Sequence, residues 1–289
     1  MRAARTRVAP SLIRTAELSG SDRPSQDRIF LTKNAVIVLD GASQPEPSTR
    51  DGGWYAEVLG STLYYQLSRK PEADLKNLLS AAITTVVDRY DLQPGTSPSS
   101  TVSVLRWGER VDVLVLGDSP VVALTANDEI NMIRDDRLRR IGRVEREQLA
   151  HAGFSSDHHV RWRQLVDAER AMRNQPEGYW IAEAVPDAAA HAHCAQWDAE
   201  DLAAVLVMTD GVSAGVDRYG LVAHWQAAFA VARPDPSRLV DMVHSAELGD
   251  PDGVRWRRSK RHDDKAVVLA EFAKPVRPAG REPSSRLAG

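Results

Sequence analysis

The sequence is poor in the residues that form cross-links and membrane spans. Its 289 residues include one cysteine, Cys194, which excludes an intramolecular disulfide and is typical of a protein kept in a reducing compartment. No run of about 18 apolar residues occurs anywhere in the chain. The segment from Met1 to Arg14 has no apolar core of signal-peptide length. These absences predict a cytoplasmic protein.

A positive net charge is also missing. The formal net charge is −3 and the sequence pI is near 6.3, so no overall positive field attracts nucleic acid or an anionic membrane, and we expect neither as a partner. Hydrophobic residues make up 43% and charged residues 27% of the chain, which is the balance of a globular protein with a packed core. Any recognition of phosphate must then be local.

Short apolar segments that stop at turn residues predict the strands. They lie at residues 35–39, 101–106, 111–116, 121–124, 205–209 and 265–272. Helical spacing of apolar residues predicts helices near residues 54–67, 75–90, 221–232 and 236–246. The helices come in pairs and the strands in runs, unlike the alternation of a parallel sheet, so a layered α+β fold is favoured. We expect the three strands between residues 101 and 124 to form a meander.

The length of the chain is compatible with one large two-sheet domain. We expect this domain at residues 15–273, preceded by a flexible N-terminus at residues 1–14. The highly charged helical segment at residues 134–173 is expected to be an insert. The tail at residues 274–289 contains several prolines and no periodic apolar face, which predicts disorder.

Four aspartates fall at the ends of expected strands. Asp40, Asp118 and Asp210 each follow an apolar run, and Asp263 precedes the last one. Hard divalent cations such as Mg²⁺ and Mn²⁺ prefer oxygen ligands, so carboxylates on rigid strand ends suit them. Asp-Gly is also a common turn dipeptide, which explains any one of these aspartates alone. The ordered set of four favours a metal site.

A longer series of motifs runs through the same segments. It consists of Asp27, Asp40-Gly41, Ser100-Thr101, Gly117-Asp118-Ser119, Thr209-Asp210-Gly211 and Asp263-Asp264-Lys265. In this order the series resembles that of the metal-dependent type 2C protein phosphatases, over residues 19–272, and the chain is similar to a divergent bacterial member. The resemblance implies an α+β fold of four layers: a central antiparallel β-sandwich flanked by helix pairs, with the metals in a cleft at one end.

The resemblance also implies roles for individual residues. Asp40 resembles the aspartate that bridges two catalytic Mn²⁺ or Mg²⁺ ions, and the carbonyl of Gly41 resembles a ligand of the second ion. Asp210 and Asp263 look like the remaining carboxylate ligands of the first ion. Asp118 resembles a residue that helps to hold a third, more labile ion.

Four positions near the N-terminal motifs complete the comparison. Asp27 resembles the aspartate that binds a metal-bound water, whereas Gln26 stands where many relatives have a glutamate ligand and offers a neutral carbonyl oxygen. Residues 42–44 replace a Gly-Gly-His stretch whose histidine is proposed to protonate the leaving alcohol. Arg23 is the nearest match to a phosphate-binding arginine, at a spacing to Asp27 that is one residue shorter than usual.

The activity implied by the resemblance is hydrolysis of phosphoserine and phosphothreonine in proteins by a metal-activated water, with phosphorylated protein as the partner. The departures leave a second hypothesis, a catalytically weak or inactive pseudophosphatase that acts as a binding module. A third is hydrolysis of a small phosphorylated metabolite. The basic run at residues 255–261 either attracts phosphorylated substrate to the cleft or forms a solvated loop.

Overall fold

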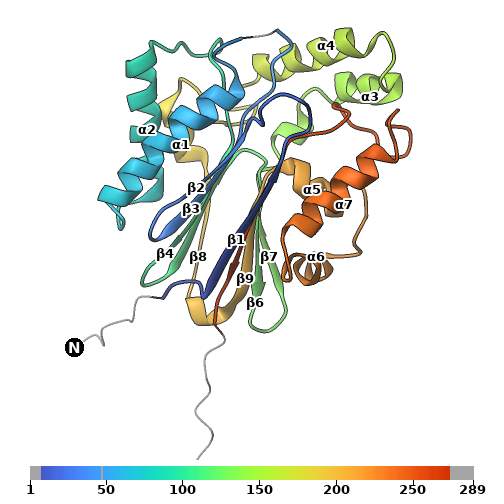
Figure 1. The fold of residues 1–289 in the computed structure, drawn as a ribbon. Coiled ribbons are helices and arrows are strands. Elements are labelled where there is room, and N and C mark those ends of the chain that lie inside the picture. The colour runs from blue at the N-terminus through green and yellow to red at the C-terminus, as the bar shows by residue number, and fades with distance from the viewer. Residues whose placement is uncertain (1–7, 47, 274–289) are drawn as a thin grey trace, which may run out of the picture.

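Two five-stranded antiparallel sheets pack face to face in the computed structural model, which describes residues 8–46 and 48–273 (Figure 1). The strand order is β1-β10-β9-β6-β7 in the first sheet and β2-β3-β4-β5-β8 in the second. The first sheet comprises β1 Leu12–Leu18, β6 Val121–Thr125, β7 Ile130–Ile133, β9 Leu202–Met208 and β10 Lys265–Glu271. The second comprises β2 Asp27–Leu31, β3 Ala35–Asp40, β4 Val102–Trp107, β5 Val111–Leu116 and β8 His193–Trp197.

The central strands are apolar on both faces because each face is covered. In β3, Val36 and Val38 join the cluster between the two sheets, which also contains Val205 of β9. Ile37 and Leu39 point the other way and join the cluster under the outer helices. A strand buried on both sides has the continuous apolar pattern from which β3 was expected.

A pair of helices covers the second sheet. α1 spans Gly52–Arg69 and α2 spans Leu75–Tyr90, and both pack their buried leucines on β3 and β4. Each helix begins after an aspartate, Asp51 or Asp74, whose side chain accepts a backbone N–H from the first turn. Capping of this kind stabilises a helix start by about 1 kcal/mol.

The first sheet is covered on its outer side by α5 Asp210–Asp217, α6 Trp225–Ala232 and α7 Ser237–Leu248. Phe229 of α6 is fully buried in the cluster that these helices form with β9 and β10. The molecule therefore has four layers, helices, sheet, sheet and helices, as Figure 1 shows. The predicted α+β sandwich is confirmed.

The charged segment at residues 134–173 contains α3 Arg143–Ala152 and α4 His158–Ala171, which lie beyond one end of the sandwich (Figure 1). The remaining regular elements are short 3-10 helices: η1 Leu138–Arg140, η2 Pro186–His191 and η3 Ala199–Asp201. None of the helices in the described part of the chain combines the length and the apolar composition that crossing a bilayer requires.

The expected meander is wrong at its third strand. β4 pairs with β5 in the second sheet, but β6 pairs with β7 and β9 in the first. Residues 117–120 thus carry the chain across the sandwich. Apolar periodicity cannot reveal such a crossing, because both sheets bury the same kinds of side chain.

The folded domain begins earlier than the sequence predicted. The boundary placed after residue 14 falls inside β1, which begins at Leu12 and pairs with β10 along its whole length. β1 is an edge strand made of half-buried and exposed residues, so it lacks the apolar run from which a strand is predicted. The tail at residues 274–289 and residues 1–7 lie outside the described residues.

Candidate metal centre

Four aspartates meet at one end of the sandwich, although they lie far apart in the sequence. Asp27 and Asp40 face each other as the first residue of β2 and the last residue of β3. Asp210 opens α5 just after β9, and Asp263 lies just before β10. Burial, and then the charges of the other three carboxylates, raise the pKa of Asp40 well above its usual value, so the four groups interact electrostatically.

The backbone at Asp40 is held by the segment that leads into β4. The Asp40 N–H donates to Thr101 Oγ1 at 3.1 Å, and the Asp40 carbonyl accepts from Ser100 Oγ at 2.9 Å. Gly41 is buried against α1, where a Cβ would lie 2.3 Å from the carbonyl carbon of Gly52, so only glycine fits there. These contacts fix the position of the Asp40 side chain and of the Gly41 carbonyl.

Asp27 is the most buried of the four aspartates and links the two sheets. It is 3% exposed, and its Oδ2 accepts a hydrogen bond from Thr209 Oγ1 at 2.8 Å. Thr209 Oγ1 in turn accepts the N–H of Ala266 at 3.0 Å. Burial raises the pKa of Asp27 well above its usual value, and the bond from Thr209 partly offsets this.

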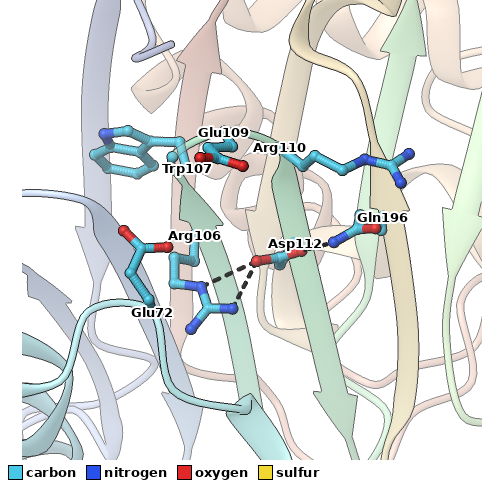
Figure 2. Close-up of a pocket in the computed structure, with 8 residues that line it drawn as sticks. Glu72, Arg106, Trp107, Glu109, Arg110, Asp112 and Gln196 are labelled. Atoms are coloured by element: carbon cyan, nitrogen blue, oxygen red, sulfur yellow. Dashed lines mark hydrogen bonds and ion pairs between the residues drawn. The ribbon is translucent and has the colours of Figure 1, made fainter. Parts of the chain in front are cut away.

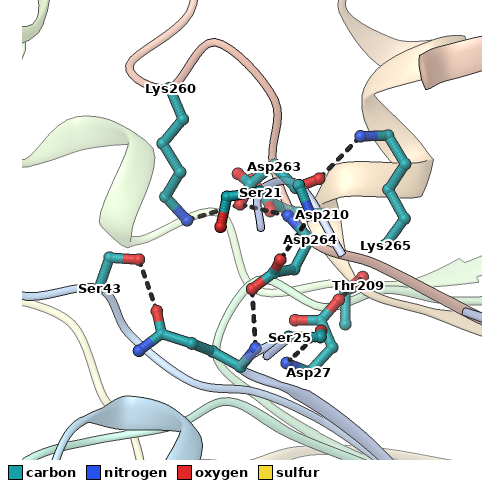
Figure 3. A network of polar contacts seen from close by, with 12 residues as sticks. Ser21, Ser25, Asp27, Ser43, Thr209, Asp210, Lys260, Asp263, Asp264 and Lys265 are labelled. Carbon is teal, nitrogen blue, oxygen red and sulfur yellow. Dashed lines mark hydrogen bonds and ion pairs between the residues drawn. The ribbon is translucent and has the colours of Figure 1, made fainter. Parts of the chain in front are cut away.

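Asp264 holds the loop that carries Gln26 (Figure 3). Its carboxylate oxygens accept the backbone N–H groups of Gly20 at 2.8 Å and of Gln26 at 2.7 Å. The side-chain carbonyl of Gln26 accepts from Ser43 Oγ at 2.8 Å. Gln26 therefore lies at the site, but its neutral oxygen is already engaged by a hydroxyl group.

Asp210 is packed closely against the segment before β10. A Cβ on the next residue, Gly211, would lie 2.0 Å from the carbonyl oxygen of Asp264, so this approach requires glycine. The Asp210 carboxylate accepts a hydrogen bond from Arg218 Nη2 at 3.2 Å. Thus Asp210 has a cationic neighbour in addition to the other carboxylates.

Asp118 lies on the crossing between β5 and β6. Burial and the charge of Asp210 raise the pKa of Asp118 to about 7, and Glu169 of α4 contributes in the same direction. The neighbouring Ser119 is fixed by a 2.7 Å hydrogen bond between its hydroxyl and that of Thr101. Asp118 is therefore near Asp210 and the insert, while Arg23 lies exposed on a turn before Gln26.

Lys260 is the site residue that the sequence pattern did not single out. Its Nζ donates to Asp263 Oδ1 at 2.5 Å, reaching the carboxylates from a loop (Figure 3). Burial lowers the pKa of Lys260, but the charges of Asp263, Asp40 and Asp210 outweigh this effect and raise it above its ordinary value. The position of Lys260 three residues before Asp263, in a basic run, was its one signal.

Other residues of that basic run make contacts away from the carboxylates. Arg258 is buried and pairs with Asp250 at 2.9 Å, and Arg255 lies over the ring of Trp256 at 4.3 Å. Beyond the run, Lys265 is fully buried and donates to Glu247 at 2.7 Å. The run is therefore neither a uniform basic patch nor wholly solvated, and Lys260 is the member that reaches the carboxylates.

A hollow of about 240 Å³ lies at the other end of the second sheet, around the turn between β4 and β5 (Figure 2). Arg106 crosses its floor and donates to Asp112 Oδ2 at 2.6 Å and to the carbonyl of Ala73. Gln196 donates to the second oxygen of Asp112 at 2.6 Å. Its polar groups are paired with one another, so the hollow is distinct from the aspartate cluster in both place and chemistry.

The donor set at the aspartate cluster suits hard divalent cations. It offers carboxylate oxygens and a backbone carbonyl, which are the ligands that Mg²⁺ and Mn²⁺ prefer. The raised pKa values of Asp27, Asp40 and Asp118 reflect clustered negative charge that a cation would neutralise. The residues present therefore fit a divalent metal.

Solved structures of known phosphatases have folds similar to that of this chain. The PPM serine/threonine phosphatase MsPP from Mycobacterium smegmatis, in complex with cacodylate, is 19% identical, with a TM-score of 0.55 over 92% of this chain and 100% of that one. The serine/threonine phosphatase PstP/Ppp from Mycobacterium tuberculosis is 17% identical, with a TM-score of 0.53 over 90% and 98%. The catalytic domain of PstP with two manganese ions is 18% identical, with a TM-score of 0.53 over 90% and 97%.

These similarities show a shared fold. A search of curated protein sequences gives no match. The family model for protein phosphatase 2C matches residues 16–248, a span that includes the strands from β2 to β9 and the positions Asp27, Asp40, Asp118 and Asp210. The chain therefore belongs to the protein phosphatase 2C family.

Proposed function

We propose that this chain is a metal-dependent phosphatase that hydrolyses phosphoserine and phosphothreonine in proteins. The observation that carries the proposal is the convergence of Asp40, Asp210 and Asp263 from both sheets on one place. Carboxylates raised on the ends of rigid strands form a preorganised acceptor for cations. Bound Mn²⁺ or Mg²⁺ would supply an activated water and neutralise phosphoryl charge.

We assign the residues as follows. Asp40 interacts with all the other clustered aspartates, which supports a bridging role, with the Gly41 carbonyl beside it. Asp210 and Asp263 supply the remaining carboxylates, and Asp118, near Asp210, supports a third cation position. We assign Asp27, whose Oδ2 is held by Thr209, to accept a hydrogen bond from a water in the site.

The surroundings of the site favour a protein as substrate. α4 of the insert reaches the segment after Gly41 through an ion pair between Arg163 and Glu46. Phe154, before α4, lies 4.8 Å from the guanidinium of Arg261 on the loop that carries Lys260. The insert thus contacts segments on two sides of the site, where a phosphorylated peptide would be held. We assign Arg23, exposed at the same end, to phosphate contact.

The proposal is tested by hydrolysis of an aryl phosphate with Mn²⁺ and with chelator, in the wild type and in Asp210→Asn. Turnover should require the metal, and Asp210→Asn should reduce it at saturating Mn²⁺ by at least about a hundredfold, the loss typical when one charge-stabilising group is removed. Asp88→Asn, the same change at an exposed position of α2, is the control and should retain full activity. Near wild-type, chelator-sensitive turnover in Asp210→Asn would contradict the assignment.

A second candidate is a pseudophosphatase that binds phosphorylated protein without hydrolysing it. It is favoured by Gln26, whose side chain is neutral and engaged by Ser43, and by the absence of a histidine at residues 42–44. The same assay separates the two: Mn²⁺ binding without turnover supports the binding module. We place either function in the cytoplasm, since the single cysteine, Cys194, is free and exposed.

A further inference from the structure

Lys260 brings a positive charge into the aspartate cluster. Its ammonium donates to Asp263 Oδ1 at 2.5 Å (Figure 3). The two side chains form a partly buried ion pair, 30% and 21% exposed, and the charge of Lys260 also acts on Asp40 and Asp27. The lysine therefore neutralises one carboxylate of the proposed metal set.

The position of Lys260 is built into the fold rather than reached by a free side chain. On one side, the buried Arg258 donates to the carbonyls of Arg261 at 2.9 Å and of Glu247 at 3.2 Å. On the other, the Asp263 carboxylate accepts the N–H of Asp264 at 3.0 Å. Because these contacts fix the backbone of the loop on both sides of Lys260, the Lys260 ammonium is held within reach of the carboxylates.

A second feature of this chain, the neutral side chain of Gln26, also limits the negative charge at the site. Gln26, at the end of the loop that Asp264 holds, is neutral, and its carbonyl oxygen accepts from Ser43. Asp27, Asp40, Asp210 and Asp263 carry four negative charges when all are ionised, and Arg218, which donates to Asp210, carries one positive charge. The guanidinium of Arg218, the ammonium of Lys260 and a single divalent cation together carry four positive charges. Two divalent cations beside Lys260 would leave an excess of positive charge that Gln26 cannot offset.

We propose that Lys260 takes the place of one of the two divalent cations that Asp40 would otherwise bridge, so that this site holds one metal ion tightly, binds any further cation weakly and uses a lysine ammonium as its second positive group. The inference rests on the proposed metal-dependent function and specifies its cofactor. Phosphorylated substrate would then meet one metal ion and one ammonium, a point charge that suits phosphate oxygens.

The test is a calorimetric titration of the chelator-treated full chain with Mn²⁺, together with electron paramagnetic resonance of the bound Mn²⁺. The wild type should bind one ion tightly and give the signal of an isolated Mn²⁺. Lys260→Gln removes the charge, and the affinity for a second Mn²⁺ should rise by at least about tenfold, because like charges a few ångströms apart repel strongly at a partly buried site. Lys260→Gln combined with Gln26→Glu should bind two ions and show the coupled signal of a metal pair.

Two controls distinguish the effect of the positive charge at position 260 from the effect of removing any positive charge from this loop. Arg257→Gln makes the same charge change at an exposed position of the same loop and should bind one ion like the wild type. Lys260→Arg keeps the charge and should also bind one ion tightly. If Lys260→Gln fails to fold, the wild type and Lys260→Arg still decide the stoichiometry.

The outcomes distinguish this inference from the function on which it rests. Two Mn²⁺ ions of equal affinity in the wild type, with no change in Lys260→Gln, would overturn the role of Lys260 and leave the metal-dependent phosphatase standing. If the wild type bound no Mn²⁺, or if Asp210→Asn bound Mn²⁺ as tightly as the wild type, the proposed function itself would be overturned.

Discussion

At the scale of single residues, the clustered carboxylates are not equivalent. Burial and neighbouring charges raise the pKa of Asp40, so the fold disfavours its ionised form in the absence of metal. Lys260 lowers the pKa of Asp263, so the fold favours the ionised form there. Two residues proposed to bind the same cofactor therefore have opposite effects on the metal-free protein.

This difference predicts opposite effects of the same substitution on stability. In chelator at pH 7, Asp40→Asn should raise the free energy of unfolding by about 1 kcal/mol, since each unit of pKa elevation costs the ionised folded state about 1.4 kcal/mol. Asp263→Asn should lower it by about 1 kcal/mol, because it removes an ionised partner of Lys260. Urea unfolding of the two variants measures both; changes of the same sign would contradict the assignment of Lys260.

At the scale of elements, the central strands and the paired helices could be predicted from the sequence, because each is marked by a continuous apolar run or a helical stripe. α2 was expected at residues 75–90 and is observed as Leu75–Tyr90. β1, β2, β7 and β8 were missed, since each is short or lies at an edge, where half-exposed residues give no clear pattern.

The same limit applies to the site. Asp40 and Asp210 could be found because each ends a strong apolar strand in Asp-Gly. Lys260 could not, because a lysine in a loop with four arginines has no local signal that it, rather than an arginine, reaches the carboxylates. Its place depends on Arg258 and Asp250, which fold the loop through a buried ion pair between residues eight positions apart.

The insert gives a prediction at this scale. Just after α4, Arg173 donates to Glu183 at 3.1 Å, and their side chains are 9% and 1% exposed. Arg173→Met should lower the free energy of unfolding by about 3 kcal/mol, because it leaves a buried carboxylate without its positively charged partner. Arg163→Met breaks the exposed pair with Glu46 and should cost less than about 1 kcal/mol.

Chemical denaturation of the two arginine variants measures this difference directly. Both substitutions remove one arginine from the same segment and replace it with the same side chain. Equal losses of stability would mean that the buried pair does not anchor the exit of the insert to the sandwich.

At the scale of the whole molecule, the proposed ligands come from both sheets: Asp40 from the second, and Asp210 and Asp263 from the ends of strands in the first. Without metal, the hydrogen bond between Thr209 and Asp27 joins the sheets at this end. A cation held by Asp40 and Asp210 would add a second link. Metal binding should therefore stabilise the complete sandwich rather than a single loop.

Thermal unfolding measures this linkage. At a free Mn²⁺ concentration a hundred times the dissociation constant, the wild type should gain about 2.7 kcal/mol. For a chain of this size, this corresponds to a rise in Tm of roughly 5 to 10 °C. Asp210→Asn should show a much smaller rise at the same Mn²⁺ concentration, and an equal rise would show that the cation binds elsewhere.

The antiparallel pairing of β1 with β10 has a practical consequence for anyone who wishes to attach this protein to something else. Leu12 lies opposite Glu271, whereas Leu18 lies opposite Lys265, close to Asp263. The starting point of β1 and the end point of β10 are therefore neighbours at the pole farthest from the carboxylates. A fluorescent reporter, an affinity tag or a surface tether joined there would leave the end of the sandwich that carries the aspartates unobstructed, and one short linker could join both points in a circularly permuted protein.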